Sequence, residues 1–352
     1  MSRLQRQTLH ARRGSPSLLD DWPWKAGNPA WPATMANGRP WPTVSIVTPS
    51  FNHAKFLEAT IRSVVCQGYP NLDYLIMDGG STDESVAIIR RYASALSYWV
   101  SESDAGQADA INKGWRRAQG EILAYLNSDD LYLPHAIRRV VECFVQHPEV
   151  DLVYGSLQVV DEQGRPAGKS VEVPDVSLSW LLRRPIPQPT MFIRRSVVER
   201  IGLFDPSLYY VFDWDFCLRA AVAGIRMARI PGAPLAAFRS WTNQKTADGF
   251  ERQVQEQLWI RDRLLTNPDL PRQRIGEVRF SKAWAFLWPA YQCYRMGRRQ
   301  HARQLLHQAV AVHRRIMLQP GFLGLYARTL LGSRLTTRVR RIKARLTGRV
   351  PG

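Results

Sequence analysis

Four short polar clusters in the first 130 residues carry side chains that could hold a nucleotide or a metal ion. Each follows an apolar run, and three of the four contain carboxylates: PSFN (49–52), DGGSTD (78–83), SESDAG (101–106) and NSDD (127–130). Alone, DGGSTD could be a tight turn with a helix cap, and NSDD could be a capped helix start. Carboxylates gathered at one place repel one another and cost stability unless a ligand needs them. Taken together, the clusters favour a binding site.

Carboxylate chemistry narrows the class of ligand. Carboxylates accept hydrogen bonds from ribose hydroxyls or a base N–H, and they hold a hard divalent cation that in turn binds phosphates. The chain has neither GxGxxG nor GxxxxGK[ST], the glycine loops that cradle phosphate directly. A nucleoside diphosphate with Mg²⁺ or Mn²⁺ meets both demands.

Strand and helix patterns alternate along the same stretch of chain. Apolar runs lie at 43–49, 72–78, 96–102 and 121–127, and the helical patterns that follow them lie at 53–68, 81–94, 107–120 and from 134 onward. Four consecutive strand-then-helix units predict a mainly parallel sheet with right-handed crossovers and helices on both faces. Because ligands of such sheets bind beyond the carboxyl ends of the strands, the polar clusters should meet at one edge.

The pattern changes after residue 150. Residues 150–168 predict a strand pair with a turn at Gln163 and Gly164, residues 188–195 another strand, and FDWDFCLRAAVAG (212–224) a polar turn running into a helix. We expect this second half to continue the same sheet. Beyond about residue 250 the sequence is helical in character, with basic amphipathic stretches at 302–317 and 336–346.

The net charge of +18 is concentrated in the C-terminal region. Residues 251–352 hold 21 basic and 5 acidic side chains, or +16, and residues 281–352 hold 15 basic and none acidic. Such an asymmetry is typical of attraction to a polyanionic surface. The region could be a solvated appendage, a lipid-binding segment or a nucleic-acid-binding segment. Interleaved apolar and basic residues at 283–299 favour an anionic membrane surface, and the absence of a recognised binding module makes nucleic acid the weaker alternative.

The N-terminal residues and the cysteines bear on localisation. Residues 1–42 are rich in Trp and Pro and predict an extended arm whose Trp side chains dock on the body or touch lipid headgroups. The four cysteines are scattered singly without metal-ligand spacing, which favours a reducing compartment. We find no signal-peptide pattern and no run of the ~18–20 apolar residues that a spanning helix needs. We expect a cytoplasmic protein, peripheral at the inner face of the cell membrane.

Seven motifs follow one another along residues 43–246. They are VSIVTPSFN, MDGGSTDES, SESDAGQADAINKG, AYLNSDDLYLP, QPTMFIRR, GLFD and FDWDFCLRA. In order and spacing they resemble the family 2 inverting glycosyltransferases with the GT-A fold, and the resemblance covers residues 43–246. It implies an α/β, Rossmann-like, mainly parallel sheet flanked by helices, here with a basic helical C-terminal extension. The expected organisation is an arm (1–42), a GT-A domain (43–250) and a basic helical region (251–352).

The resemblance also implies a reaction and its partners. A sugar would move from a nucleotide-diphosphate sugar donor to an acceptor hydroxyl, on a glycan or a lipid-linked glycan, with inversion and with Mg²⁺ or Mn²⁺. The setting would be cell-surface polysaccharide or glycolipid assembly.

Site residues follow from the same resemblance. The positions that match donor-nucleotide contacts are Pro49, Ser50, Asn52, Asp78, Gly79, Asp104, Asn112, Lys113, Ser128 and Arg239. NSDD is similar to the family's DxD element, with Asn127 where many members have Asp. This departure leaves Asp129 as the first candidate metal ligand and Asp130 as the second.

FDWD resembles the acidic motif that supplies the general base, although Phe212 stands where Glu is common. The resemblance implies Asp213 as the base and Asp215 as a supporting acid. Either could instead be a cap for the helix that follows. Residues 238–246 resemble a loop that closes over the donor, which makes Lys245 a further candidate phosphate contact beside Arg239.

Two other classes of protein share parts of this pattern. A nucleotidyltransferase should carry a phosphate-binding glycine and basic loop after the first strand, which TPSFNHAKF does not provide. A nucleotide-binding protein without catalysis should have lost the acids, whereas Asp78, Asp129 and Asp213 are all present. Glycosyl transfer is the stronger hypothesis.

Overall fold

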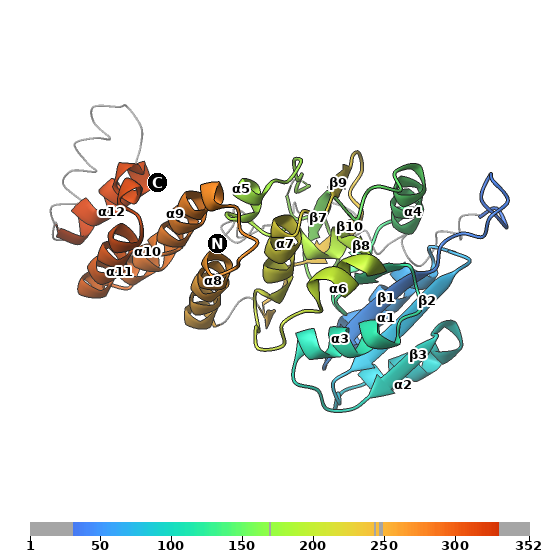
Figure 1. The fold of residues 1–352 in the computed structure, drawn as a ribbon. Coiled ribbons are helices and arrows are strands. Elements are labelled where there is room, and N and C mark those ends of the chain that lie inside the picture. The colour runs from blue at the N-terminus through green and yellow to red at the C-terminus, as the bar shows by residue number, and fades with distance from the viewer. Residues whose placement is uncertain (1–30, 169, 243, 246–248, 331–352) are drawn as a thin grey trace, which may run out of the picture. The chain divides into compact units, whose positions relative to one another are not determined.

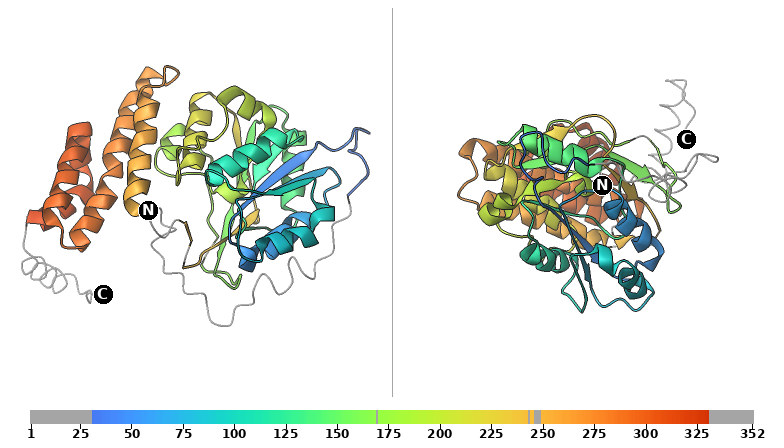
Figure 2. Two further views of the ribbon diagram at one scale, coloured as in Figure 1. Left: turned by 90° about the horizontal axis from the view of Figure 1, so that it is seen from below. Right: turned by 90° about the vertical axis from the view of Figure 1, so that its right-hand side faces the viewer.

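A computed structural model describes residues 31–168, 170–242, 244–245 and 249–330. The chain divides into two compact units, residues 2–248 and residues 249–352. The described part of the first unit contains two sheets with their helices, and the described part of the second is helical (Figures 1 and 2). We treat each unit by itself.

The first unit is built on a seven-stranded sheet of order β3-β2-β1-β4-β8-β6-β9. Its strands are β1 (Val44–Ser50), β2 (Leu72–Asp78), β3 (Tyr98–Ser101), β4 (Ile122–Tyr125), β6 (Leu152–Gly155), β8 (Phe192–Arg194) and β9 (Met227–Ile230). Strands β1 to β4 are mutually parallel, β8 is antiparallel to both neighbours, and β6 is parallel to β9. The prediction of a mainly parallel sheet is confirmed.

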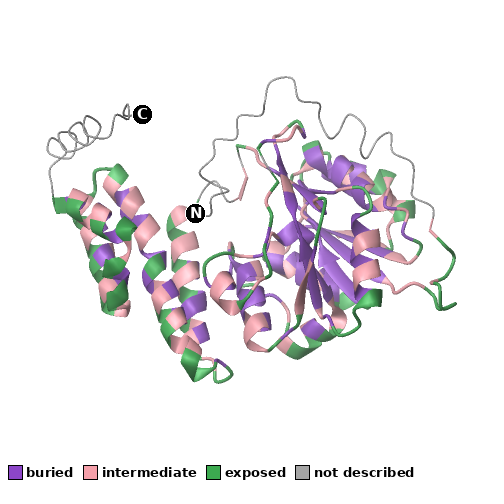
Figure 3. Cartoon of the chain, turned by 90° about the horizontal axis from the view of Figure 1, so that it is seen from above, coloured by how far each residue is buried: buried purple, intermediate pink, exposed green. Residues whose placement is uncertain are grey.

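Alternating side chains of β1 pack on the two opposite faces of this sheet. Val44 and Ile46 lie in a core cluster with apolar residues of α1 (Ala54–Val65), α2 (Ser85–Arg91) and α4 (Ala136–Gln146). Val47 instead meets α3 (Gln107–Arg117), where a Cβ on Gly114 would lie 2.5 Å from Val47 Cγ1. Only glycine permits so close an approach of helix and strand. Figure 3 shows the strands as a buried layer among the helices.

The second face carries an aromatic cluster that joins distant segments. Trp115 of α3 lies 4.6 Å from Phe204 between ring centroids, and Phe204 lies 5.1 Å from both Phe212 and Phe216. The last two belong to α7 (Phe212–Val222), which follows α5 (Leu178–Leu181), a 3₁₀ turn (Gln188–Thr190) and α6 (Arg195–Ile201). This packing holds the start of α7 against the sheet.

One expectation for the second half of the sheet is wrong. The segment before the predicted turn does not stay in one sheet, because it divides into β6, in the large sheet, and β7 (Leu157–Val160), in a three-stranded sheet with β5 (Leu131–Tyr132) and β10 (Ala236–Arg239). The turn is present, because Gly164 N–H donates to Asp161 O and Asp161 N–H to Arg165 O. Among the described residues, the chain beyond the turn meets β7 through two isolated bridges, Leu157 with Val171 and Val160 with Pro166, while the strand that pairs with β7 is β10. The second sheet places β10 beside the NSDD loop.

The described end of the N-terminal arm docks on the first unit. Trp31 Nε1–H donates to Gln67 O at 3.2 Å, and its ring contacts those of Trp41 and Tyr69 edge-on. The docking expected for the Trp residues is confirmed for Trp31 and Trp41. Residues 1–30, with the remaining arm tryptophans, lie outside the described residues.

The second unit consists of helices packed around their own core. It contains α8 (Phe250–Leu265), a 3₁₀ turn η6 (Arg272–Arg274), α9 (Ile275–Ala285), α10 (Leu287–Arg295), α11 (Arg299–Val312), η7 (Arg314–Leu318) and α12 (Pro320–Leu330). The expected helical stretch at 302–317 thus comprises α11 and η7, whereas the stretch at 336–346 lies outside the described residues. Within the part of the chain that the structure describes, none of the helices has the length and apolarity needed to cross a membrane.

Candidate active site

The carboxyl ends of β1, β2 and β3 meet in register at one edge of the large sheet. Ser50 lies opposite Asp78, and Asp78 lies opposite Ser101. The Ser50 hydroxyl is buried and has no hydrogen-bond partner among the described residues, whereas its backbone oxygen accepts from Gly79 N–H. A buried polar atom without a partner costs free energy, which is tolerated where a ligand completes the bond. Pro49 precedes it inside β1.

Asp78 fixes the loop that follows β2. Its carboxylate accepts from Ser81 N–H at 2.9 Å, from Ser81 Oγ at 2.6 Å and from Ser101 Oγ at 2.7 Å. Asn52, which has a φ of 52°, connects the loop after β1 to the same loop, because its Oδ1 accepts a hydrogen bond from Thr82 N–H at 2.8 Å. Asp78 and Asn52 therefore shape this edge of the sheet through the loops that they hold.

Gly79 packs closely against Asp104 and Phe51. A Cβ on Gly79 would lie 2.8 Å from Asp104 Oδ2 and 3.4 Å from the Phe51 ring, so a larger residue here would displace the Asp104 side chain. Burial raises the pKa of Asp104, whose Oδ1 accepts from Gly106 N–H at 2.8 Å. The Phe51 ring is 58% exposed, and an exposed ring beside a carboxylate can stack on a base whose N–H the carboxylate accepts. Sequence reasoning missed Phe51, although an aromatic residue directly after a buried strand was a usable signal.

The NSDD loop after β4 has one carboxylate committed to the fold. Asp130 is fully buried; its Oδ1 accepts from Arg239 N–H at 3.0 Å, and its backbone oxygen accepts from Thr60 Oγ1. Burial and the neighbouring Asp129 carboxylate raise the pKa of Asp130 well above its usual range. Ser128, also expected near the nucleotide, instead bonds His53 Nδ1 through its hydroxyl at 2.6 Å. Asp130 and Ser128 thus act as anchors of the loop.

Asp129 is the carboxylate of this loop that keeps bonding capacity. Its Oδ2 accepts from Trp241 Nε1–H at 2.9 Å, and its backbone oxygen accepts from Arg239 Nε–H at 2.9 Å. A carboxylate offers about four lone-pair sites, so one indole bond leaves room for a cation. Among the described residues, no group of three or more His, Cys, Asp or Glu is placed to hold a metal ion. Trp241 was not identified from the sequence.

Asn127, which departs from the family's DxD pattern, has a specific hydrogen-bonding role. Its Oδ1 accepts from Gln107 Nε2, and its Nδ2 donates to Gln188 Oε1 at 3.1 Å. An aspartate could not make the second bond unless it were protonated. Asn127 therefore links α3, the NSDD loop and the turn before β8 without adding a third carboxylate beside Asp129 and Asp130.

Arg239 is buried beside the NSDD loop and forms hydrogen bonds to it. The side chain is 1% exposed, stacks 4.7 Å from the Phe56 ring centroid and donates to Glu162 O as well as to Asp129 O. Within the described part of the chain, its Nη2 has no hydrogen-bond partner. These contacts position the loop, so the expected phosphate contact of Arg239 would require this side chain to leave its buried site.

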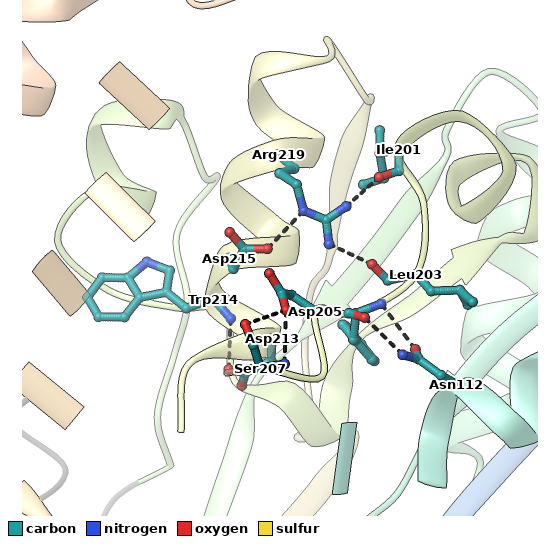
Figure 4. Close-up of polar contacts among 10 residues, drawn as sticks. Asn112, Ile201, Leu203, Asp205, Ser207, Asp213, Trp214, Asp215 and Arg219 are labelled. Carbon is teal, nitrogen blue, oxygen red and sulfur yellow. Dashed lines mark hydrogen bonds and ion pairs between the residues drawn. The ribbon is translucent and has the colours of Figure 1, made fainter. Parts of the chain in front are cut away.

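Asn112 and Lys113 differ in position. Asn112 lies away from the sheet edge, whereas Lys113 lies near the end of β3, where its positive charge partly opposes the rise in the pKa of Asp104. The Asn112 side chain is buried and uses both ends of its amide on Phe204, donating to the backbone oxygen at 2.9 Å and accepting from the backbone N–H at 3.1 Å (Figure 4). Lys113 Nζ lies 3.3 Å from Asp109 and 3.7 Å from Glu102. Asn112 therefore positions the segment that leads to α7.

Asp213 and Asp215 both lie in the first turn of α7. The expectation of a polar turn before this helix is wrong, because the helix begins at Phe212, and the N-cap residue is Val211. Asp215 is buried and pairs with Arg219 at 2.8 Å, and Arg219 also donates to the backbone oxygens of Ile201 and Leu203 (Figure 4). Asp215 thus anchors the loop before α7.

Asp213 is the acid of this pair that remains available. It is half-buried, and its Oδ1 accepts from Trp214 N–H at 2.7 Å. Desolvation by the surrounding protein raises the pKa of Asp213 to about 6, against partial opposition from the Trp214 N–H and the positive charge of Lys245. A carboxylate with a pKa near working pH can take a proton from a hydroxyl and release it afterwards.

Lys245 connects the two acidic regions. Its Nζ donates to Gln107 Oε1 at 2.8 Å and lies 3.9 Å from the Tyr209 ring centroid. Gln107 bonds Asn127 of the NSDD loop, while the charge of Lys245 acts on Asp213. The NSDD loop and the start of α7 therefore face the same edge of the first unit.

Comparisons with known proteins agree with this site. Residues 45–202 match the family model described as glycosyl transferase family 2. Relatives include uncharacterised glycosyltransferases of Rickettsia typhi (31% identical over 182 residues, 49% of this chain and 57% of the relative) and Mycobacterium tuberculosis strain CDC 1551 / Oshkosh (32% over 188 residues, 51% and 70%). A PGL/p-HBAD biosynthesis glycosyltransferase of Mycobacterium bovis is 32% identical over 183 residues, 51% of this chain and 69% of the relative. The chain belongs to glycosyltransferase family 2.

Solved structures agree on the fold. S. aureus TarS 1–349 in complex with UDP superposes with a TM-score of 0.58 at 18% identity, over 82% of this chain and 88% of TarS. A mannosyltransferase of Pyrobaculum calidifontis in complex with GDP-Man and Mn²⁺ gives a TM-score of 0.52 at 18% identity, over 88% and 87%. At these identities the likeness establishes the GT-A architecture. The match to the Rickettsia typhi relative spans 57% of that relative's length.

Proposed function

We propose that the chain is a metal-dependent, inverting glycosyltransferase that moves a sugar from a nucleotide-diphosphate sugar to an acceptor hydroxyl. Residues 43–250 would form the catalytic domain, preceded by the arm of residues 1–42 and followed by the basic helical region of residues 251–352. One observation carries the proposal. At one sheet edge, the Asp129 carboxylate keeps lone pairs for a cation, and the half-buried Asp213 is linked to the same edge through Lys245 and Gln107.

The donor nucleotide fits the edge formed by β1 and β2. Phe51 would stack on the base, Asp104 would accept from a base or ribose donor, and the unpartnered Ser50 hydroxyl would bond the ligand. Asp78 and Asn52 would hold the loops around it. The neighbours bound to UDP and to GDP-Man support a nucleotide of this class.

Asp129 suits a hard divalent cation held jointly with a substrate. Mg²⁺ is commonly bound by one or two carboxylates, with phosphate oxygens and water completing the shell, and the Mn²⁺ in the mannosyltransferase neighbour supports this mode. A bound cation would supply Lewis-acid neutralisation of the departing diphosphate. Within the protein, the bonds from Trp241 and Arg239 would hold the Asp129 carboxylate and backbone in place for that cation.

Asp213 suits the general base. It would accept the proton of the acceptor hydroxyl as that oxygen attacks the anomeric carbon from the face opposite the leaving diphosphate, which inverts the configuration. A direct displacement needs no covalent intermediate, so no nucleophilic side chain is required. The acceptor would be a glycan or lipid-linked glycan of the cell surface, a setting supported by the relative that is named for PGL/p-HBAD biosynthesis.

The test is a panel of nucleotide sugars incubated with purified full-length protein and Mn²⁺ or Mg²⁺. We expect release of nucleoside diphosphate with at least one donor, and loss of that release in EDTA. Release should persist in Asp175→Asn, a control that changes a highly exposed carboxylate paired only loosely with Arg229. Metal-independent release at an unchanged rate would overturn the metal assignment, and no release in the presence of glycan and lipid-linked acceptors would overturn the function.

A further inference from the structure

The second unit has an apolar surface on α12 that its own core does not cover. Phe322 and Leu325 of this helix are buried in the core of the unit. Leu323, Ala327 and Leu330 lie on the other face, spaced i, i+4 and i+7, and all three are exposed. Residues with this spacing form one stripe along a helix, so α12 is apolar on two faces.

The neighbouring turn η7 adds to this exposure. Ile316 anchors η7 in the core, whereas Leu318 is 75% exposed and Met317 is 41% exposed. Leu323 and Leu330 on α12 are 57% and 56% exposed. We call Met317, Leu318, Leu323, Ala327 and Leu330 the α12 surface. Leaving large aliphatic side chains in water forgoes about 25 cal/mol per Å² of apolar area, so a clustered exposure of this kind suits an interaction site.

The segment of chain that carries the α12 surface is basic. Residues 281–330 contain eight basic side chains and no acidic one; Lys282 pairs with Asp262 of α8, whereas Arg314 and Arg315 of η7 are exposed. The 22 residues that follow in the sequence add seven basic and no acidic side chains. Exposed leucines with neighbouring arginines match the interface of an anionic bilayer, which accepts both kinds of side chain at once.

We propose that the α12 surface inserts Leu318, Leu323 and Leu330 into the interfacial region of an anionic lipid bilayer while Arg314 and Arg315 bind its headgroups. This surface is made of residues other than those of the proposed transfer site, and its test requires neither donor nor acceptor. A second copy of the chain is the other occupant to consider. Specific protein interfaces use roughly 20 to 30 residues a side, far more than the five apolar side chains of the α12 surface.

The experiment is vesicle co-sedimentation of the full chain with phosphatidylcholine vesicles that contain or lack phosphatidylglycerol. We expect binding to the anionic vesicles and a fall in partition coefficient of about ten-fold or more in a Leu318→Ser/Leu323→Ser/Leu330→Ser variant, because three apolar side chains no longer enter the interface. The apolar control is Val145→Ser, which changes a 42% exposed side chain of the first unit. Circular dichroism checks that each variant is folded.

Charge variants separate insertion from simple attraction of the basic tail. Arg314→Gln/Arg315→Gln should weaken binding more than the matched pair Arg116→Gln/Arg117→Gln, which removes the same charge from exposed positions of the first unit. Wild-type partition in the triple-Leu variant would overturn the proposal, as would absence of binding to anionic vesicles. Light scattering addresses the second copy: a dimer lost in that variant while vesicle binding stays unchanged would assign the α12 surface to self-association instead.

Discussion

Two regions of the first unit each place two aspartates within three residues, and they divide the work in the same way. In the NSDD loop, Asp130 is fully buried and bonded to the backbone of β10, while the Asp129 carboxylate, also buried, accepts a hydrogen bond from the Trp241 indole. In the first turn of α7, Asp215 is paired with Arg219, while Asp213 is half-buried and available. Asp130 and Asp215 therefore fix the backbone that positions Asp129 and Asp213, respectively.

The anchors differ in how they are stabilised. Asp130 is held by a backbone N–H and an amide, and burial beside Asp129 raises its pKa well above the usual range, which favours the neutral acid. Asp215 is held by a guanidinium that also bonds two carbonyls. Substitutions should therefore separate the chemical acids from the anchoring acids, and the two anchors from each other.

The largest expected effect is that of Asp129→Asn. We expect kcat/KM for sugar transfer to fall by about 10³-fold or more, since a cation contributes several kcal/mol to a transition state and each 1.36 kcal/mol is a factor of ten. The melting temperature should stay close to that of wild type, because the bond from Trp241 can be kept by the amide oxygen. Turnover within a few-fold of wild type would remove Asp129 from the proposed metal site.

Asp213→Asn should lower kcat by about 10²- to 10⁴-fold, the usual contribution of a general base. The free energy of unfolding of this variant should stay the same or increase, although its activity falls. The pKa of about 6 in the folded protein lies above that of an unfolded aspartate, so ionised Asp213 costs stability as the pH rises through about 6. The variant should therefore unfold at the same or a higher temperature than wild type at pH 8, as followed by calorimetry. A folded variant with normal kcat would refute the role.

The anchoring pair should affect stability first. Arg219→Gln leaves the buried Asp215 carboxylate without its partner, and we expect a loss of about 3 kcal/mol in the free energy of unfolding. Arg165→Gln breaks an ion pair of the same i, i+4 spacing with Asp161 at a more exposed position and should cost less than about 1 kcal/mol. Denaturant unfolding measures both, and equal losses would contradict a special role for the Asp215–Arg219 pair.

The smallest effect concerns the pH profile. Activity should decline below pH 6 as Asp213 becomes protonated. The positive charge of Lys245 lowers the pKa of Asp213, so Lys245→Met should move the acidic limb of the kcat profile to higher pH, while Lys245→Arg should leave it nearly in place. An unchanged limb in the methionine variant would show that Lys245 does not act on Asp213.

Much of the site could be predicted from the sequence because its residues lie at the ends of strands. The end of a strand can be predicted from a single sequence, since a polar residue follows an apolar run there. Ser50, Asp78 and Asp129 each follow an apolar run, and a parallel sheet brings them to one edge. The resemblance also implied Asp213 as the base and Asp215 as the supporting acid, and this division stays a prediction. The i, i+4 spacing of Asp215 and Arg219 was a usable signal once FDWD was assigned to the helix.

The remaining contacts join residues too far apart in the chain to infer. Trp241 bonds Asp129 across 112 positions, and Asn112 bonds Phe204 across 92. Such pairs depend on how β10 and α7 pack on the sheet, which local pattern does not specify. For the same reason the sequence could not predict that the segment after residue 150 divides between two sheets.

The most direct test of the central claim is calorimetric binding of UDP and GDP, with and without Mn²⁺, to wild type, Asp129→Asn and Asp213→Asn. We predict that Mn²⁺ strengthens binding of at least one nucleotide to wild type and to Asp213→Asn by similar factors, and that Asp129→Asn loses the Mn²⁺-dependent part. Equal loss in both variants, or binding that Mn²⁺ leaves unchanged in wild type, would contradict the division of labour between the two acidic regions.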